Sequence, residues 1–255
     1  MSKWVLKGLR TGIKSTFYPD REETTQGVSP GLPGGKEDTG ILASLLIARC
    51  PTGALLRHGE QIGVNFRRCI HCYRCLRGIG TPVDWKRGYE WAALMEGKDG
   101  AGNLLGKAFH RSLHVRFVDG GACGACLSEV EQINKPYYNM HRLGFFITPT
   151  PREADILLVA GPVTDPMRLP LQKAFEAMPT PKRVLAIGAC ALSGGVFGPS
   201  FASGSGVSEL IPVDIGVPGC PPPPLAILHG LLLAVSRKPS ASLTFPESAG
   251  GRKNS

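Results

Sequence analysis

The stretch Asp155-Ile156-Leu157-Leu158-Val159-Ala160 is an almost wholly apolar run of strand length, and it predicts a buried β-strand. Similar short runs recur on both sides of it after residue 113, and segments of helical character separate them. The predicted strands are His114–Val118, Gly144–Thr148, Asp155–Ala160, Val184–Gly188 and Ile211–Val213. The predicted helices are Leu127–Asn134, Pro166–Met178 and Pro224–Arg237. Because strands that alternate with helices form βαβ units, this half of the chain predicts an α/β fold with a parallel sheet.

The chain before this region is less regular. Its first residues predict a short amphipathic helix, rich in Lys and Arg, whose apolar side consists of Trp4, Val5, Leu9 and Ile13. Such a helix is either a loosely ordered arm or a tether to another subunit or to a bilayer surface. The predicted divisions of the chain are an arm and linker at 1–40, a small segment that contains four of the eight cysteines at 41–110, an α/β domain at 111–240 and a tail at 241–255.

The bulk composition narrows the class of protein. The chain has 255 residues, 42% of them hydrophobic, which is enough to bury at least one full core. Its longest apolar runs, Leu225–Leu228 and Leu231–Val235, are too short to span a membrane, and its start lacks the apolar stretch of a signal peptide. We therefore expect a soluble or peripheral protein in a compartment that keeps thiols reduced. In such a compartment, clustered cysteines bind metals more often than they form disulfides.

The net charge of +9 raises the question of a nucleic-acid partner. The basic residues are scattered, and neither a helix–turn–helix nor an aromatic platform is present, so we expect no nucleic acid. The charge fits equally well with docking onto acidic partner subunits or onto an anionic membrane face.

Four of the eight cysteines fall where predicted strands end, and they are Cys123, Cys126, Cys190 and Cys220. Because the carboxyl ends of parallel strands share the sheet edge where ligands gather, we expect these thiols to converge. Glycines flank each of them, and glycine allows the close backbone approach that a metal cluster needs. Four thiolates favour a [4Fe–4S] cluster, while a tetrahedral zinc site and inert buried thiols are the alternatives.

The other four cysteines form half of a bacterial ferredoxin motif, and they are Cys50, Cys69, Cys72 and Cys75. The Cys-Pro of the motif lies before the triplet of cysteines, at Cys50-Pro51. In two-cluster ferredoxins, the Cys-Pro cysteine ligates the cluster whose other three ligands come from the triplet farther along the chain. The set therefore predicts one [4Fe–4S] cluster, or a labile [3Fe–4S] form of it, without the second cluster of a two-cluster ferredoxin. The segment Leu55–Phe66 between them predicts a strand–turn–strand, and His71 is predicted to be a solvent-facing spacer rather than a ligand.

Residues 113–235 resemble the electron-transferring small subunit shared by membrane-bound [NiFe] hydrogenases and respiratory complex I, where it is the 20 kDa subunit. The matching stretches are Ala154–Thr164, Met178–Lys182, Gly188–Gly195 and Val217–Pro222. The resemblance implies a flavodoxin-like fold. It also implies that the cluster of Cys123, Cys126, Cys190 and Cys220 lies nearest to a partner large subunit.

The spacing of the first two of these cysteines separates two branches of that family. Complex I subunits carry two adjacent cysteines, whereas Cys123-Gly124-Ala125-Cys126 resembles the small subunits of group 4 [NiFe] hydrogenases and formate hydrogenlyases. Glu129 matches the family's acidic residue, which implies cluster tuning or a proton relay. An ordinary first-turn acid that complements the helix dipole is the alternative. The opening residues, Met1–Pro19, resemble the ferredoxin-type subunits of formate hydrogenlyase.

From these features we expect an electron-relay subunit of a membrane-associated, formate hydrogenlyase-like complex on the cytoplasmic face of the inner membrane. Its expected partners are a [NiFe]-hydrogenase-type large subunit, a ferredoxin-like or other electron-donor subunit, and membrane subunits. No catalytic residue is assigned, because the chain shows no nucleophile–base pair, phosphate loop or nickel site. Two alternatives are a quinone-reducing, complex I-like 20 kDa-type subunit, with quinone near Pro162–Met167, and a zinc-stapled interaction module.

Overall fold

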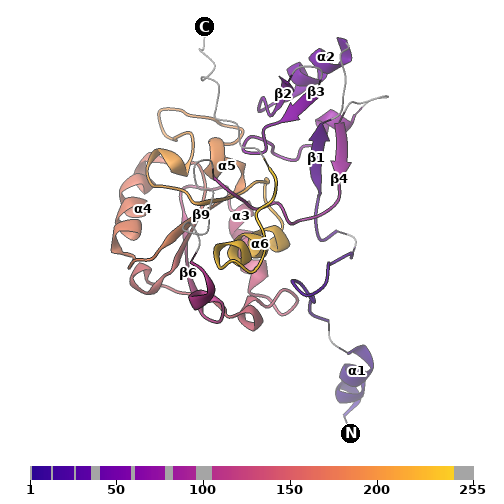
Figure 1. Cartoon of the computed structure of the whole chain (residues 1–255), viewed down its shortest axis with the longest axis vertical. Coiled ribbons are helices and arrows are strands. Elements are labelled where there is room, and N and C mark those ends of the chain that lie inside the picture. Colours follow the sequence, from indigo (N-terminus) through magenta and orange to yellow (C-terminus); the bar gives the residue numbers. More distant parts are fainter. Residues whose placement is uncertain are drawn as a thin grey trace.

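The computed structural model describes residues 2–12, 14–25, 27–35, 41–58, 61–77, 83–95 and 105–243. A larger α/β domain lies beside a smaller segment built around α2, and helix α1 stands at the far end of the molecule (Figure 1). None of the helices in these residues has the length and apolar character needed to cross a bilayer.

The α/β domain contains a six-stranded sheet with the order β5-β10-β9-β8-β6-β7. Its strands are β5 (Ala93–Leu94), β6 (Leu113–Asp119), β7 (Phe145–Ile147), β8 (Ile156–Ala160), β9 (Arg183–Ile187) and β10 (Ile215–Val217). All neighbours pair in parallel except β5, which lies antiparallel to β10 at one edge. Counted in chain order, the parallel strands follow the flavodoxin-like order 2-1-3-4-5. The predicted fold class is therefore confirmed.

One predicted strand is wrong, because the last strand is β10 and not Ile211–Val213. Ile211 and Val213 are apolar because they are buried in the core, without pairing in the sheet. The chain joins the sheet only at Asp214. Its N–H donates to the Val184 carbonyl at 3.0 Å, and its carboxylate accepts from the Val184 N–H at 2.8 Å. The apolar run indicated burial correctly, but the polar residue after it determines where the strand begins.

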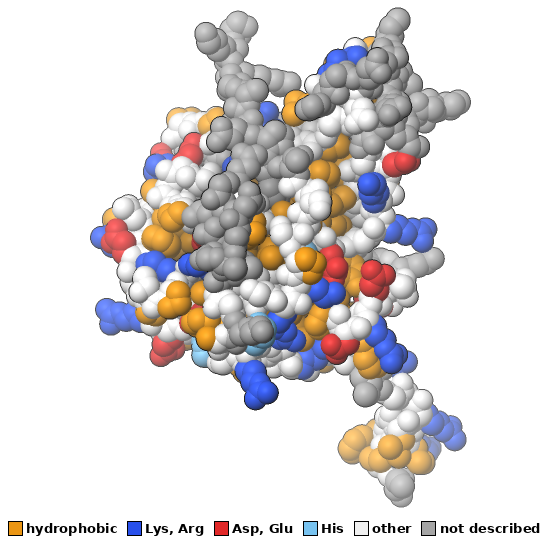
Figure 2. Space-filling view, viewed as in Figure 1, with side chains coloured by type: hydrophobic (Ala, Val, Ile, Leu, Met, Phe, Trp, Pro, Cys, Tyr) orange, Lys and Arg blue, Asp and Glu red, His pale blue; other side chains and the backbone are white. Residues whose placement is uncertain are grey.

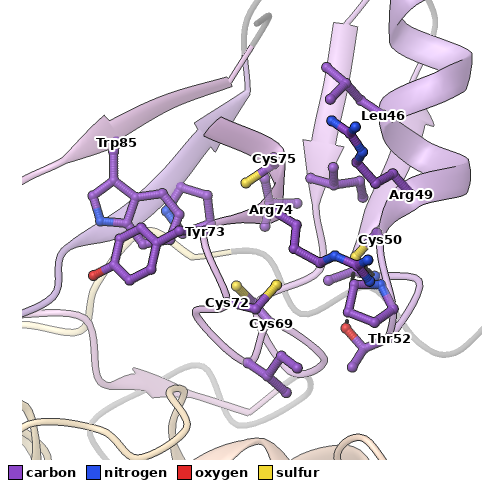
Figure 3. A pocket seen from close by; sticks show the side chains of 16 residues that line it. Leu46, Arg49, Cys50, Thr52, Cys69, Cys72, Tyr73, Arg74, Cys75 and Trp85 are labelled. Atoms are coloured by element: carbon purple, nitrogen blue, oxygen red, sulfur yellow. Dashed lines mark hydrogen bonds between the residues drawn. The ribbon is translucent and has the colours of Figure 1, made fainter. Parts of the chain in front are cut away.

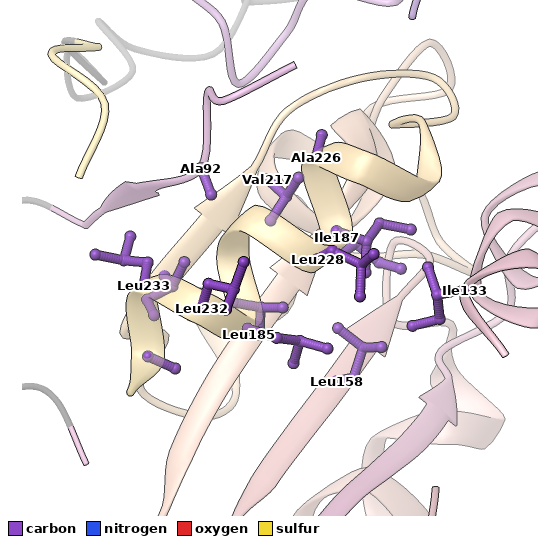
Figure 4. Close-up of a cluster of buried hydrophobic side chains, with 14 of the residues drawn as sticks. Ala92, Ile133, Leu158, Leu185, Ile187, Val217, Ala226, Leu228, Leu232 and Leu233 are labelled. Carbon is purple, nitrogen blue, oxygen red and sulfur yellow. The ribbon is translucent and has the colours of Figure 1, made fainter. Parts of the chain in front are cut away.

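Helices cover both faces of the sheet. On one face lie α3 (Ala125–Ile133) and α6 (Pro224–Ala234), and on the other lie α4 (Asp165–Ala177) and α5 (Gly188–Ser193). Every residue of α6 is buried, and Figure 4 shows its leucines against the side chains of β8 and β9. Because β8 is covered on both faces, all its side chains are fully buried. The predicted helices are confirmed, although α6 ends three residues earlier than expected.

The smaller segment has its own apolar cluster. It contains α2 (Ile41–Arg49), the antiparallel pair β1 (Leu32–Gly35) and β4 (Val83–Lys86), and the hairpin strands β2 (Leu55–His58) and β3 (Gln61–Val64). The predicted strand–turn–strand is confirmed by β2 and β3, and residues 59–60 between them lie outside the described part of the chain. Short 3₁₀ turns complete the described chain at Arg74–Leu76, Lys107–Phe109, Met140–Leu143, Pro151–Glu153 and Val207–Glu209.

Helix α1 (Lys3–Thr11) buries none of its residues. Trp4 is 74% exposed and Leu9 is 71% exposed. Figure 2 shows hydrophobic side chains on one side of this helix and basic ones on the other. The predicted amphipathic helix is therefore confirmed over these residues, while Ile13 lies outside the described residues.

Candidate metal centres

The second cysteine set lies at the carboxyl edge of the sheet, as predicted. Cys123 and Cys126 follow β6, with Cys126 in the first turn of α3, while Cys190 is in α5 after β9 and Cys220 follows β10. The carboxylate of Asp119, at the end of β6, accepts hydrogen bonds from the backbone N–H groups of residues 121 and 122 at 2.9 and 2.6 Å. This turn fixes the path of the chain toward the two cysteines.

Two glycines make room for sulfur atoms at this edge. A Cβ on Gly188 would lie 2.8 Å from the Cys126 Sγ, and a Cβ on Gly195 would lie 2.6 Å from the Cys190 Sγ. Both glycines also adopt positive φ angles, of 86° and 66°. Any side chain at either position would therefore meet a thiol as well as an unfavourable backbone conformation.

The second set shares one electrostatic environment. The pKa of the Cys126 thiol is raised to about 12, first by burial and then by the charges of Cys220, Cys190 and Cys123. The pKa of Cys190 is raised to about 11 by burial and by the charges of Cys220 and Cys123. Four thiolates this close repel one another, and a bound cationic metal group would reverse that penalty. Cys123 and Cys220 are exposed, so this centre opens onto the surface.

The first cysteine set lines a single cavity of about 30 Å³. Figure 3 shows the sulfur atoms of Cys50, Cys69, Cys72 and Cys75 around the same space. Burial, followed by the charges of the other three cysteines, raises the pKa of the Cys69 thiol to about 12. The predicted ligands of this set are thus brought together from the end of α2 and from the loop after β3.

The backbone around the first set offers N–H donors to the sulfurs. The Ala54 N–H donates to the Cys50 Sγ at 3.2 Å, and a backbone hydrogen bond from His71 partly offsets the raised pKa of Cys69. His71 and Tyr73 have left-handed φ angles of 52° and 57°. Backbone turns that aim N–H groups inward bind anionic groups, iron–sulfur clusters among them. The donor set and its backbone therefore suit a thiolate-ligated cluster.

His71 is not the solvent-facing spacer that the sequence predicted. Its side chain is buried, and its ring makes edge-to-face contacts with Trp85 and Trp91 at centroid distances of 5.9 and 5.8 Å. Neither ring nitrogen has a hydrogen-bond partner among the described residues, and burial lowers the pKa of His71 to about 4. Cysteine spacing fixes the positions of ligands but not the direction of the side chains between them, and both tryptophans come from later in the chain.

Glu129 lies on α3, three residues after Cys126, and is half-buried. Burial raises the pKa of its carboxyl group, and its charge in turn contributes to the raised pKa of Cys126. Its assignment to cluster tuning or proton relay stays a prediction.

Among the described residues, both cysteine sets included, no three His, Cys, Asp or Glu side chains are placed as a group that could hold a metal ion.

Comparison with known proteins identifies relatives of the α/β domain. The model of a family described as NADH ubiquinone oxidoreductase, 20 Kd subunit, matches residues 123–234, a range that contains the second cysteine set and not the first. Formate hydrogenlyase subunit 7 of Escherichia coli is 40% identical over 129 residues, which are 51% of this chain and about half (51%) of that protein's length. The probable membrane-bound hydrogenase subunit mbhJ of Pyrococcus furiosus is 44% identical over 133 residues, 52% of this chain and 80% of the relative.

The solved structure of the membrane-bound sulfane sulfur reductase, an archaeal respiratory membrane complex, contains a chain that is 30% identical to this one. The alignment covers 49% of this chain and 68% of that chain, with a TM-score of 0.44.

Proposed function

The chain belongs to the family of the 20 kDa subunit of NADH ubiquinone oxidoreductase, and from that premise we propose that it is an iron–sulfur electron-relay subunit of a membrane-associated, [NiFe]-hydrogenase-type complex. One observation carries the proposal: the second cysteine set converges at one edge of a flavodoxin-like sheet, inside the region that matches the family. Relatives named formate hydrogenlyase subunit 7 and membrane-bound hydrogenase subunit support the hydrogenase branch.

In this proposal, each cysteine set holds one [4Fe–4S] cluster, which supplies one-electron chemistry when bound. The ligands are Cys50, Cys69, Cys72 and Cys75 for the first cluster, and Cys123, Cys126, Cys190 and Cys220 for the second. The protein's part is to hold the thiolates, to place N–H donors such as that of Ala54 beside sulfur, and to limit solvent access by burying Cys69 and Cys126. Hydrogen bonds to sulfur and burial are the means by which a protein sets cluster potentials. No catalytic residue is proposed in this chain.

The surface beside the second set supports a large-subunit partner. The loop that follows Cys190 exposes two aromatic side chains, Phe197 at 77% and Phe201 at 97%. Exposed aromatic residues at a protein surface often mark an interface. With Cys123 and Cys220 also exposed, a subunit docked here would cover both the cluster and the aromatic residues. The first set would receive electrons from a ferredoxin-like or other donor subunit.

Helix α1 supports a position at the membrane surface. Its apolar side carries the exposed Trp4 and Leu9, and its other side carries only basic charges, from Lys3, Lys7 and Arg10. Short helices of this kind lie in the interface of anionic membranes. We place the complex on the cytoplasmic face of the inner membrane, where it would contact membrane subunits.

The test is to purify the native complex anaerobically from membranes by a tag on this chain. The proposal predicts a large subunit that contains nickel, and hydrogen production when the complex is supplied with reduced methyl viologen. A complex without nickel that reduces quinones would contradict the hydrogenase assignment.

That second outcome corresponds to the alternative function, a quinone-reducing subunit like that of complex I. One observation favours it: the segment Pro162–Met167, which runs into the first turn of α4, lies against the turn that leads to Cys123. A Cβ on Gly121 would come within 2.5 Å of the Thr164 side chain, and one on Gly161 within 2.8 Å of the Ala122 backbone nitrogen. A quinone bound at this loop would therefore lie beside the second centre.

A further inference from the structure

The two candidate centres are joined by a chain of direct contacts between aromatic rings and backbone. His71 stands between Cys69 and Cys72 in the first centre, and its buried ring contacts Trp91 edge to face. The indole N–H of Trp91 donates to the carbonyl of Pro218 at 2.9 Å, in a buried hydrogen bond. Pro218 is two residues before Cys220, a ligand of the second centre. One histidine and one tryptophan therefore connect the two cysteine loops.

A second connection runs parallel to the first. The Arg67 Nε donates to the Leu192 carbonyl at 3.3 Å, and the Ser193 hydroxyl donates to the Arg67 carbonyl at 2.8 Å. Leu192 and Ser193 belong to α5, the helix that carries Cys190. Phe66, next to Arg67, packs against all three apolar clusters of the described chain. The loop that leads into Cys69 is thus fixed onto the helix that holds a ligand of the other centre.

The surroundings of His71 indicate how its ring is used. Its nitrogens have no hydrogen-bond partner among the described residues, so the ring contributes shape and contact area rather than polar bonding. A buried polar group without a partner is costly and calls for an explanation. The explanation offered by the contacts is packing: the ring fills the space between two indoles and thereby holds the first loop against Trp91.

We infer that His71 and Trp91 are positioning residues that fix the separation of the two clusters, and so govern the electron step between them. The inference rests on the proposed function. That step would move one electron from the reduced cluster held by the first cysteine set to the oxidised cluster held by the second, with no bond formed or broken and no proton moved. The reductant is the electron-donor subunit in the complex, or dithionite in the test below.

The chain offers a matched control for Trp91. Trp85 makes the same edge-to-face contact with His71 at nearly the same distance, but its indole N–H donates to the carbonyl of Pro30, outside both cysteine sets. Replacing either indole by phenyl keeps a ring beside His71 and removes one hydrogen bond. Only Trp91→Phe removes a bond to the Cys220 loop.

The measurement is the distance between the two dithionite-reduced clusters of the full chain, taken from their spin–spin interaction by pulsed electron paramagnetic resonance. The wild type and Trp85→Phe should both give one narrow distance, whereas Trp91→Phe should give a broad distribution with both cluster signals and the iron content retained. A narrow, unchanged distance in Trp91→Phe would overturn the inference.

A second pair of variants covers the case in which Trp91→Phe fails to fold. His71→Phe should keep the wild-type distance, because it retains a ring and gives up no hydrogen bond, whereas His71→Ala should broaden the distribution. Equal distributions in these two variants would also overturn the inference. Failure of the proposed function is distinguishable, because the wild type itself would then lack one or both cluster signals.

Discussion

At the scale of single residues, three of the candidate ligands have a close neighbour that cysteine spacing does not reveal. Gly188 and Gly195 leave space for the sulfurs of Cys126 and Cys190, and the Ala54 N–H meets the Cys50 sulfur. The cysteines themselves could be predicted from the sequence as two sets of four. The orientation of His71 could not, because its contacts come from tryptophans 14 and 20 positions further along the chain.

Gly195→Ala should remove the second cluster and leave the first in place. The new methyl group would lie 2.6 Å from the Cys190 Sγ and would push the thiol out of position. The measurement is the cluster signal of the anaerobically purified variant in electron paramagnetic resonance.

Gly198→Ala is the control for that prediction, because its φ of 67° nearly equals the 66° of Gly195, while nothing lies within 4 Å of its Cβ position. Both variants should lose about 1 kcal/mol of stability through backbone strain. Only Gly195→Ala should lose cluster. Equal cluster content in the two variants would count against the placement of Cys190 at the centre.

At the scale of elements, β5 joins the smaller segment to the sheet, and its attachment depends on α6. The buried His229 of α6 accepts a hydrogen bond from the Ala92 N–H through Nδ1 at 3.0 Å, and its Nε2 lies 3.1 Å from the Pro239 carbonyl. An imidazole with Nε2 protonated satisfies both contacts, so the ring is neutral. The sequence did not predict β5, because two residues at a sheet edge carry no periodic signal.

The free energy of unfolding should fall in acid because of His229. Burial lowers the pKa of His229 in the folded protein below its ordinary value of 6.5, so below pH 6.5 the unfolded chain binds a proton that the folded protein does not. The stabilising contribution is present above pH 6.5 and is lost below it, by at most about 1.4 kcal/mol per pH unit. Urea unfolding between pH 7 and pH 5 measures this slope. It should become shallower in His229→Gln and stay unchanged in the control, exposed His141→Gln.

Binding of α1 to membranes should depend on its exposed apolar side chains. The double substitution Trp4→Ser and Leu9→Ser should reduce sedimentation with phosphatidylserine-containing vesicles, without change in unfolding stability, because α1 buries no residue. Leu169→Ser, on the exposed side of α4, is the matched control and should bind like the wild type. If the double variant binds as tightly as the wild type, the helix serves instead as a contact to another subunit.

At the scale of the whole molecule, the chain combines two units that the sequence revealed to different extents. The α/β domain was predictable because its strands are strongly apolar and its cysteines follow them. The error at Ile211–Val213 arose because burial and strand pairing give the same apolar signal. The packing of the smaller segment against the α/β domain could not be predicted, because it depends on hydrogen bonds between residues far apart in the sequence, such as Trp91 with Pro218 and Arg67 with Leu192.

The most direct test of the central claim is the iron, sulfide and zinc content of the anaerobically purified chain, combined with electron paramagnetic resonance of the reduced protein. The account predicts about eight irons per chain and two distinct [4Fe–4S] signals. Cys72→Ser should abolish one signal and Cys126→Ser the other, each leaving about four irons. A colourless protein that contains zinc, or one signal that both substitutions remove, would contradict it.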